Sequence, residues 1–386
     1  MKVAVYNLYW TTYGGGEQVA AGIAEHCVRQ GHDVTLLGPH PVDVEMTRRR
    51  LGRSLDGCTY RRVVDDVEAS AISREFDLFV NGTYLSSAIP RSALSLYYVH
   101  FPGVPRTTRQ QFIATGARAG LAVLGGINSL PSAIEGVRAG FERRIHDVSW
   151  AQQYTAMAAN SAFTARWVDQ LWNVTPSVLN PPVDQMAFET SRSPLVLSLG
   201  RFFDRSFGHC KKQDVLLDAW ESYEQRANSD WAFSLIGGAD GASREYVLAL
   251  KRQASALRVT VDVNAPRDTV DRAFRSASLL WHAAGHGEDS ERHPDRFEHF
   301  GIAVVEAMSA GIVPIVHRSA GPAEIVRHGV DGFHWETVEE LLTISESLMN
   351  STSSVVELGR SSRLRAAEYS YETFGRKFDE LVATLR

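Results

Sequence analysis

Short runs of β-forming residues alternate with stretches of helical periodicity along most of the sequence, and this alternation constrains the fold more than any other feature. Near the N-terminus, residues 2–7 are predicted as a strand, residues 17–29 as a helix and residues 33–38 as a second strand. A strand, a helix and a strand in this order form a βαβ unit, which requires a parallel sheet. Further strands are predicted at 76–81, 94–100, 154–159, 195–200, 231–237, 259–263, 279–282 and 313–316, and further helices at 213–225, 243–256, 269–277 and 301–310.

The alternation of strands and helices is interrupted at Pro181 and Pro182 and begins again after them. Paired prolines continue neither a helix nor a central strand, so they suit a connection between domains. A chain of 386 residues is also long enough for two domains of ordinary size. We therefore predict an α/β protein with a first Rossmann-like domain over 1–182 and a second over 183–366. The final stretch, 367–386, is predicted as a packing helix, since its apolar residues recur at helical spacing: Phe374, Phe378, Leu381 and Leu385.

The composition is that of a soluble globular protein, with 44% hydrophobic and 22% charged residues. A net charge of −5 gives no reason to expect a nucleic-acid partner. The three cysteines show no metal-ligand spacing and fit a reducing compartment. The N-terminus lacks the features of a signal peptide, and no apolar run is long enough to span a bilayer. We expect a cytoplasmic protein, with any membrane contact peripheral.

Basic residues gather in one segment of the first domain, 46–62. The arginines concerned are Arg48, Arg49, Arg50, Arg53, Arg61 and Arg62. A solvated charged face is the simpler interpretation of such a cluster. The alternative is a surface for an anionic lipid carrier or for the inner face of a membrane.

Three consecutive glycines, Gly14, Gly15 and Gly16, follow the first predicted strand and lead into the first helix. Glycines let a ligand approach the backbone, and the amides at a helix N-terminus favour anionic groups. The segment is therefore predicted either as a phosphate or sugar contact or as a simple tight turn. A dinucleotide site is disfavoured, because Val19 stands where the third glycine of that motif belongs.

Two acids, Glu298 and Glu306, flank a glycine at the start of a predicted helix in the second domain. Glu298 belongs to the loop before this helix, and Glu306 lies about one and a half turns inside it. The free backbone amides of Phe300, Gly301 and Ile302 are able to hold a phosphate between the two carboxylates. One acid is then placed for the hydroxyls of a sugar and the other for those of a ribose.

This segment resembles the Glu-x7-Glu motif of the retaining glycosyltransferases of family four, which have the GT-B architecture of two Rossmann-like domains facing across a cleft. The resemblance assigns Glu298 to the donor sugar and Glu306 to the ribose. It also implies that the last helix, in 367–386, returns to the first domain.

Two other passages carry the same resemblance. Arg201 follows a predicted strand, and Lys211, preferred over Lys212, precedes the next helix. They are similar to the family's two cations that neutralise the donor diphosphate. His100, at the end of another predicted strand, resembles the family's active-site histidine, which hydrogen-bonds the transferred sugar; a purely structural histidine is the alternative.

The resemblance implies transfer of a hexose from a nucleotide sugar to an acceptor hydroxyl, with retention of the anomeric configuration. Similarity to the mannosyltransferases that extend lipid-linked oligosaccharides favours GDP-mannose as donor and a glycan, a lipid-linked sugar or a small glycoside as acceptor. No cofactor and no metal are expected, because the two cations and the helix supply the positive charge. A metal cluster of His282, His286, Glu288, Glu291 and His293 is disfavoured by its loose spacing. Two alternatives are a nucleotide-sugar epimerase of the same fold and a non-catalytic GT-B-like partner protein.

Overall fold

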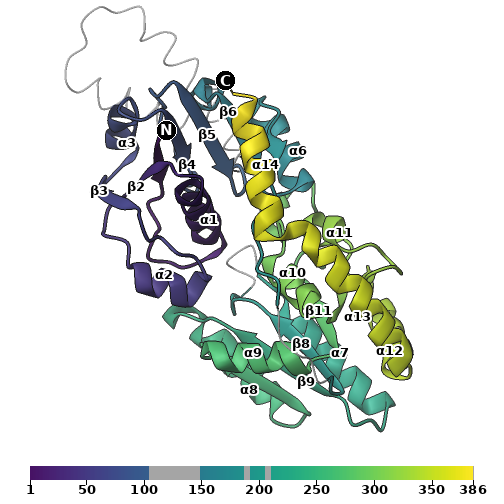
Figure 1. The fold of residues 1–386 in the computed structure, drawn as a ribbon. Helices are drawn as coiled ribbons and strands as arrows, with labels where there is room; N and C mark the ends of the chain where they lie inside the picture. The colour runs from purple at the N-terminus through teal and green to yellow at the C-terminus, as the bar shows by residue number, and fades with distance from the viewer. Residues whose placement is uncertain (104–147, 187–191, 205–209, 386) are drawn as a thin grey trace, which may run out of the picture.

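Two parallel β-sheets organise the chain in this computed structural model, which describes residues 1–103, 148–186, 192–204 and 210–385 (Figure 1). In this part of the chain, the first sheet has seven strands in the order β3-β2-β1-β4-β5-β6-β7. They are β1 (Lys2–Tyr6), β2 (Asp33–Gly38), β3 (Thr59–Arg62), β4 (Leu78–Asn81), β5 (Leu94–Val99), β6 (Ala156–Ala159) and β7 (Ser177–Val178). The order reverses between β1 and β4, and ligands of doubly wound folds bind at such a point, beyond the carboxyl ends of the strands.

The second sheet has six strands in the order β10-β9-β8-β11-β12-β13. They are β8 (Leu195–Leu199), β9 (Ala232–Gly237), β10 (Val259–Val263), β11 (Leu279–His282), β12 (Val313–His317) and β13 (Phe333–Trp335), and every recorded pairing is parallel. Its order reverses between β8 and β11. The predicted fold class, two Rossmann-like domains, is confirmed.

Helices cover both faces of each sheet. Those of the first domain are α1 (Gly15–Arg29), α2 (Val44–Leu51), α3 (Asp66–Ser73) and α6 (Ala162–Trp172). Those that follow are α7 (Gln213–Arg226), α8 (Arg244–Ala254), α9 (Arg267–Ser276), α10 (Ile302–Ser309), α11 (Ala320–Ile325), α12 (Val338–Met349), α13 (Thr352–Ala366) and α14 (Tyr371–Ala383). Short 3-10 turns lie at Ser149–Gln153, Gly241–Ser243, Pro294–Arg296 and Ala367–Tyr369.

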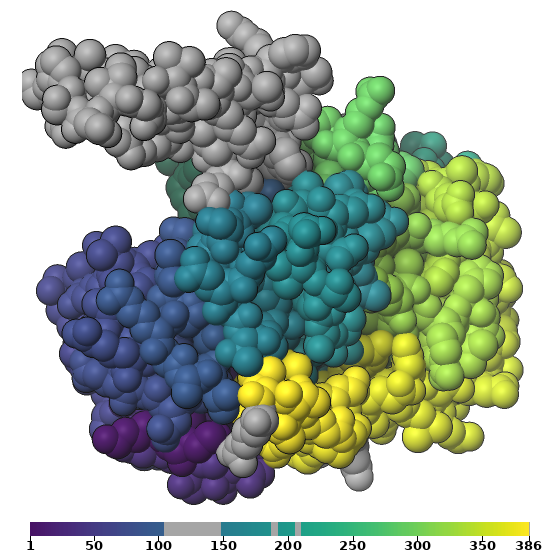
Figure 2. Space-filling model, turned by 90° about the horizontal axis from the view of Figure 1, so that it is seen from above, coloured from purple at the N-terminus to yellow at the C-terminus, as the bar shows by residue number. Residues whose placement is uncertain are grey.

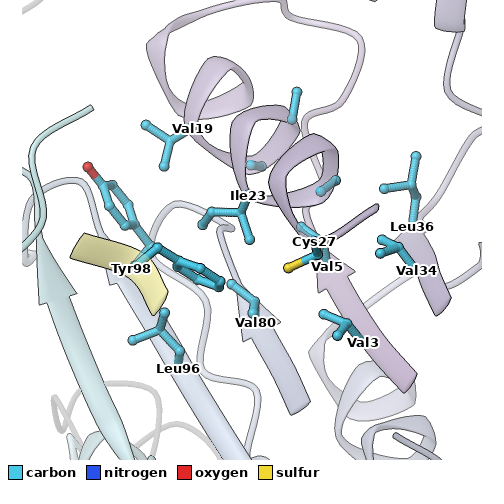
Figure 3. Close-up of a cluster of buried hydrophobic side chains, with 14 of the residues drawn as sticks. Val3, Val5, Val19, Ile23, Cys27, Val34, Leu36, Val80, Leu96 and Tyr98 are labelled. Carbon is cyan, nitrogen blue, oxygen red and sulfur yellow. The ribbon is translucent and has the colours of Figure 1, made fainter. Parts of the chain in front are cut away.

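The core of the first domain shows why its first helix forms. Val19, Ile23 and Cys27 lie on the face of α1 that meets the sheet, in one buried cluster with Val3 and Val5 of the central strand β1 (Figure 3). All five side chains are fully buried. Removing each apolar side chain from water contributes about 1.5–3 kcal/mol. The helical spacing of these residues therefore decides which face of α1 meets the sheet.

The C-terminal helix α14 returns to the first domain, as the resemblance implied. Phe374 and Phe378 of α14 belong to the same buried cluster as the α1 side chains, and Nε2 of His26 lies 2.9 Å from a carboxylate oxygen of Asp379. Figure 2 shows this last segment, in yellow, against the teal surface of the first domain. The helix ends at Ala383, so Leu385 follows it rather than extending its apolar face.

Two local predictions differ from the structure. The first helix begins at Gly15 rather than at residue 17, because the carboxylate of Glu17 accepts a hydrogen bond of 2.8 Å from the amide of Gly14 and so caps the helix. The basic segment, to which no elements were assigned, forms α2 and β3. No helix of the described residues is long and apolar enough to cross a membrane.

Candidate active site

The loops after the strands of the second sheet form the first wall of the site. Arg201 follows β8, and it lines a cavity of about 170 Å³ together with Gly238 after β9 and Asn264 after β10. Its guanidinium carbon lies 5.7 Å from the ring centroid of Phe203, and the side chain is exposed. An exposed cation at this edge of a parallel sheet is available to an anionic ligand.

Lys211 and Glu298 form an ion pair at the centre of the site. Lys211 reaches Glu298 past Gly200, where a β-carbon would lie 2.7 Å from Cγ of Lys211. Glycine at this position therefore leaves the path of the lysine open. Lys212 has a different partner, because it is buried in an ion pair with Glu288. The structure thus brings together the acid and the lysine preferred from the sequence.

The carboxylate of Glu298 is held in its charged form. Burial raises its pKa, but the charge of Lys211 and the approach of His282 lower it more, so that the pKa lies well below its ordinary value. Nε2 of His282 lies 3.5 Å from Oε2 of Glu298. A carboxylate of this kind accepts hydrogen bonds and does not serve as a general acid near neutral pH.

The start of helix α10 lies directly after Glu298. Gly301 has a φ of 111°, a backbone conformation that favours glycine, and it precedes the first helical residue, Ile302. Gly321 fixes this turn, because its amide donates to the carbonyl of Glu298 at 3.0 Å. Within the described ranges, no hydrogen-bond acceptor is recorded for the amides of Phe300, Gly301 and Ile302. These amides stay candidates for a phosphate.

Glu306 lies in a second cavity, of about 370 Å³, at the junction of the two domains. Gln18 of α1 and Arg267 and Asp271 of α9 line it as well. Burial raises the pKa of Glu306 to about 7, Arg267 lowers it, and Asp184 and Asp271 raise it further. Glu298 is not among the residues that line this cavity, so the cavity of Glu306 does not include the other acid of the motif.

The glycine segment of the first domain lies between His100 and the start of α10. A β-carbon on Gly15 would lie 3.0 Å from Cδ1 of Ile302, and one on Gly16 would lie 3.2 Å from Nε2 of His100. Both glycines belong to the first turn of α1, not to a loop before it. Their lack of side chains lets the start of α1 approach His100 on one side and α10 on the other.

His100 follows strand β5 and faces this junction. Its Nε2 lies 2.9 Å from the carbonyl oxygen of Gly82, so Nε2 carries the proton and Nδ1 keeps a lone pair. Burial lowers its pKa below the ordinary value, although the Gly82 carbonyl and Glu17 oppose this change. The amide of Asn160 holds the His100 carbonyl at 2.8 Å. A neutral, fixed imidazole is suited to a hydroxyl ligand.

Two contacts between the domains were not predicted from the sequence. The rings of Phe101 and His299 stack with centroids 3.9 Å apart and planes 7° apart. Glu324 accepts hydrogen bonds from the amides of Ala162 at 2.9 Å and Phe163 at 2.5 Å, at the start of α6. Phe101 directly follows His100, and His299 directly follows Glu298. The stack therefore holds the two predicted sugar-binding side chains across the junction, and nothing in the sequence pairs residues so far apart.

The possible metal ligands are occupied by other contacts or scattered. Glu288 pairs with Lys212 and, at 3.0 Å, with Arg296, while Glu291 lies 3.5 Å from Arg166. Among the residues that the structure describes, no group of three or more histidines, cysteines or acids is arranged to hold a metal ion.

Half of the six arginines in the basic segment are paired within the protein. Arg48 pairs with Asp56, Arg61 with Glu75, and Arg53 with Asp184. Arg53 is 3% exposed, so it is withdrawn from any surface. The exposed arginines Arg49, Arg50 and Arg62 are left for a partner, and the first two line the cavity of Glu306.

Comparison with known proteins places the second sheet in a family. Residues 186–372 match the family model described as Glycosyl transferases group 1. The chain contains a glycosyl transferases group 1 domain. This domain supplies Arg201, Lys211, Glu298 and Glu306, whereas His100 and the glycine segment lie outside the matched range.

Several relatives and solved structures are similar to the chain. The GDP-Man:Man(3)GlcNAc(2)-PP-Dol alpha-1,2-mannosyltransferase of Dictyostelium discoideum is 26% identical over 247 residues, 58% of this chain and 46% of that protein. Its human namesake is also 26% identical, over 56% of this chain and 45% of its own length. The chain spans half or less of the curated relatives it matches.

The architecture is GT-B, as the solved structures show. The crystal structure of Anabaena HepE in complex with UDP has a TM-score of 0.69 at 17% identity over the whole of both chains. Sucrose-phosphate synthase from Thermosynechococcus elongatus has a TM-score of 0.66 at 14% identity, covering 100% of this chain and 99% of that one.

Proposed function

We propose that this protein is a retaining glycosyltransferase of family four that moves a hexose from a nucleotide sugar to an acceptor hydroxyl. The observation that carries the proposal is the Glu298–Lys211 ion pair at the opening of α10, inside the matched domain. In this pair, Lys211 provides a positive charge for a diphosphate, and Glu298 provides a hydrogen-bond acceptor for sugar hydroxyls. A purely structural ion pair has no need of an adjacent helix opening whose amides are available for a phosphate.

The diphosphate of the donor binds to the cations and the helix start in this proposal. Lys211 provides a compact positive charge, and Arg201 provides a planar guanidinium that is able to donate two parallel hydrogen bonds. The amides from Phe300 to Ile302 provide the positive end of the α10 dipole. These groups also stabilise the charge that develops on the departing nucleotide, so the proposed reaction does not require a metal. Glu306, in the second cavity, binds the ribose hydroxyls.

The transferred sugar lies between Glu298 and His100. Before the donor binds, the Glu298 carboxylate is paired with Lys211, its backbone carbonyl accepts from the Gly321 amide, and the His100 ring donates to the Gly82 carbonyl. In the front-face mechanism that the resemblance implies, the bond from C1 to the phosphate oxygen breaks as the acceptor oxygen bonds to C1. The acceptor proton passes to the leaving phosphate. The protein contributes position and charge.

GDP-mannose is the favoured donor. The relatives from Dictyostelium and human carry GDP-Man in their names, whereas the Anabaena structure contains UDP. The matched sequences therefore favour GDP, and the fold alone is compatible with either nucleotide. The proposed acceptor is a glycan, a lipid-linked sugar or a small glycoside, with peripheral membrane contact through Arg49, Arg50 and Arg62 and a cytoplasmic location.

Thermal unfolding with GDP, UDP, TDP and ADP, each with and without EDTA, tests the donor. A ligand at 100 times its dissociation constant stabilises the folded protein by about 2.7 kcal/mol, which raises the Tm by several degrees. We expect a response to GDP that EDTA does not change. A selective response to UDP would contradict GDP-mannose as the donor, and it would remain consistent with a glycosyltransferase.

Transfer is then measured with radiolabelled GDP-mannose and a panel of lipid-linked and free glycosides. We expect an acceptor-dependent product in which the one-bond coupling between C1 and H1 of the transferred mannose shows retention. Conversion of the nucleotide sugar without an acceptor would identify an epimerase. Absence of binding to every nucleotide would identify a non-catalytic partner protein.

A further inference from the structure

His282 is a buried histidine that the proposed mechanism leaves without a role. It is the last residue of β11 and is 6% exposed. Trp281 points to the opposite face of the sheet, and Leu280 shares the face of His282, which is packed against α10. The position of the backbone is fixed, because the indole nitrogen of Trp335 donates to the His282 carbonyl at 3.2 Å.

The ring of His282 has no conventional hydrogen bond. Within the described residues, neither Nδ1 nor Nε2 has a hydrogen-bond partner of good geometry. The polar atom nearest to the ring in the recorded contacts is Oε2 of Glu298, 3.5 Å from Nε2. Buried polar atoms are costly when unpaired and are almost always satisfied. An apolar side chain at this position would avoid the free-energy cost of burying unpaired nitrogens. The presence of an imidazole therefore indicates a role other than packing.

The geometry of Glu298 supplies that reason. Lys211 and His282 both approach the same carboxylate oxygen, Oε2, which leaves Oε1 for a ligand. Lys211 ends a flexible chain and is 21% exposed, so it is able to turn toward a diphosphate. The imidazole of His282 is attached to a buried strand and cannot turn away as Lys211 can. His282 is therefore the neighbour that remains beside the Glu298 carboxylate.

We propose that His282 is a positioning residue for Glu298: its Nε2–H donates to Oε2 and keeps the carboxylate oriented toward the donor sugar when Lys211 turns to the diphosphate. The proposal rests on the proposed function of Glu298. It also gives Nε2, one of the two ring nitrogens without a conventional hydrogen bond, an anionic acceptor.

Three variants separate positioning from packing. His282→Gln places an amide donor near the site of Nε2, whereas His282→Leu fills the space without a donor. The control is His334→Gln, in β13, whose ring lies 2.8 Å from the carbonyl of Val326 and is not recorded in contact with Glu298. Each variant is assayed for its Tm, for its affinity for GDP, and for kcat and KM with GDP-mannose.

We expect His282→Leu to lower kcat about ten-fold or more, the usual effect of losing a hydrogen bond to a charged group. Its affinity for GDP is expected to stay within two-fold of wild type, because GDP lacks the sugar. His282→Gln is expected to restore most of kcat. In a Glu298→Gln background, His282→Leu is expected to cause no further loss. A kcat for His282→Leu equal to wild type, or an equal loss in both His282 variants, overturns the proposal.

Nuclear magnetic resonance of ¹⁵N-histidine-labelled protein tests the contact without turnover. We expect the Nε2–H tautomer at His282 and a change in its nitrogen shifts in Glu298→Gln. The Nδ1–H tautomer, or shifts that Glu298→Gln leaves unchanged, overturns the proposal. If no sugar is transferred but the shifts respond, the proposed function fails and the contact stands, so the two failures are distinguishable.

Discussion

Glu306 gives a quantitative prediction, because its side chain is half-buried at the second cavity and no hydrogen bond is recorded for its carboxylate among the described residues. Burial raises its pKa from 4.5 to about 7. The folded state therefore holds the proton more tightly than the unfolded chain does. The stability that results is fully present below the unfolded pKa of 4.5 and is lost as the pH rises through the folded pKa of about 7.

The magnitude follows from these two values. A rise from 4.5 to about 7, at ~1.36 kcal/mol per pH unit, corresponds to about 3 kcal/mol of unfolding free energy lost between about pH 4 and pH 8. Glu306→Gln removes this titration. Relative to wild type, the variant is therefore expected to gain about 3 kcal/mol over the same range, most of it between pH 5 and pH 7.

Urea unfolding followed by tryptophan fluorescence at a series of pH values measures the difference. The matched control is Glu357→Gln, an exposed acid on α13, for which the difference from wild type is expected not to change with pH. If Glu306→Gln differs from wild type by the same amount at pH 5 and pH 8, the carboxylate is not desolvated and the reasoning is refuted.

Three further predictions follow from the site and its surroundings. Lys211→Met leaves half-buried Glu298 without its main cation and is expected to lower transfer at least ~100-fold in the GDP-mannose assay, while circular dichroism shows an unchanged fold. Glu324→Ala removes a cap from α6 and is expected to cost about 1–2 kcal/mol, measured as a lower urea midpoint. Replacing Arg49 and Arg50 by alanine is expected to weaken cosedimentation with anionic vesicles in a salt-dependent way; unchanged cosedimentation contradicts the membrane contact.

Local patterns were sufficient to predict most strands of the two sheets. The apolar runs at β1, β2 and β8–β12 and the helical spacing of α1 depend on neighbours in sequence, and parallel pairing follows from their alternation. The return of α14 was implied by the resemblance, because helical spacing shows an apolar face without showing what covers it. Several elements were not predicted: the strands β3, β7 and β13 and the helices α2, α3, α6, α11, α12 and α13. In α2 and β3 the few buried residues leave little periodicity to detect.

Candidate site residues could be named from the sequence, but their partners could not. Lys211 and Glu298 were proposed separately, and 87 residues of chain separate them. The contact of Phe101 with His299 joins a loop after β5 to the loop before α10, so it depends on how the domains meet. His282 was considered only as a metal ligand, because its relation to Glu298 arises from the face of β11 that packs on α10.

The environments of Glu298 and Glu306 shift their pKa values in opposite directions, and this difference suits them to the two different roles proposed. Glu298 has compensating charge in Lys211 and stays ionised across the physiological range. Glu306 has only Arg267 to oppose two neighbouring acids and its own burial, so its pKa is about 7. Pairs of carboxyl groups whose environments separate their pKa values take different roles. A sugar held by Glu298 is then insensitive to pH, while a ribose held by the ionised form of Glu306 binds more tightly as the pH rises through 7.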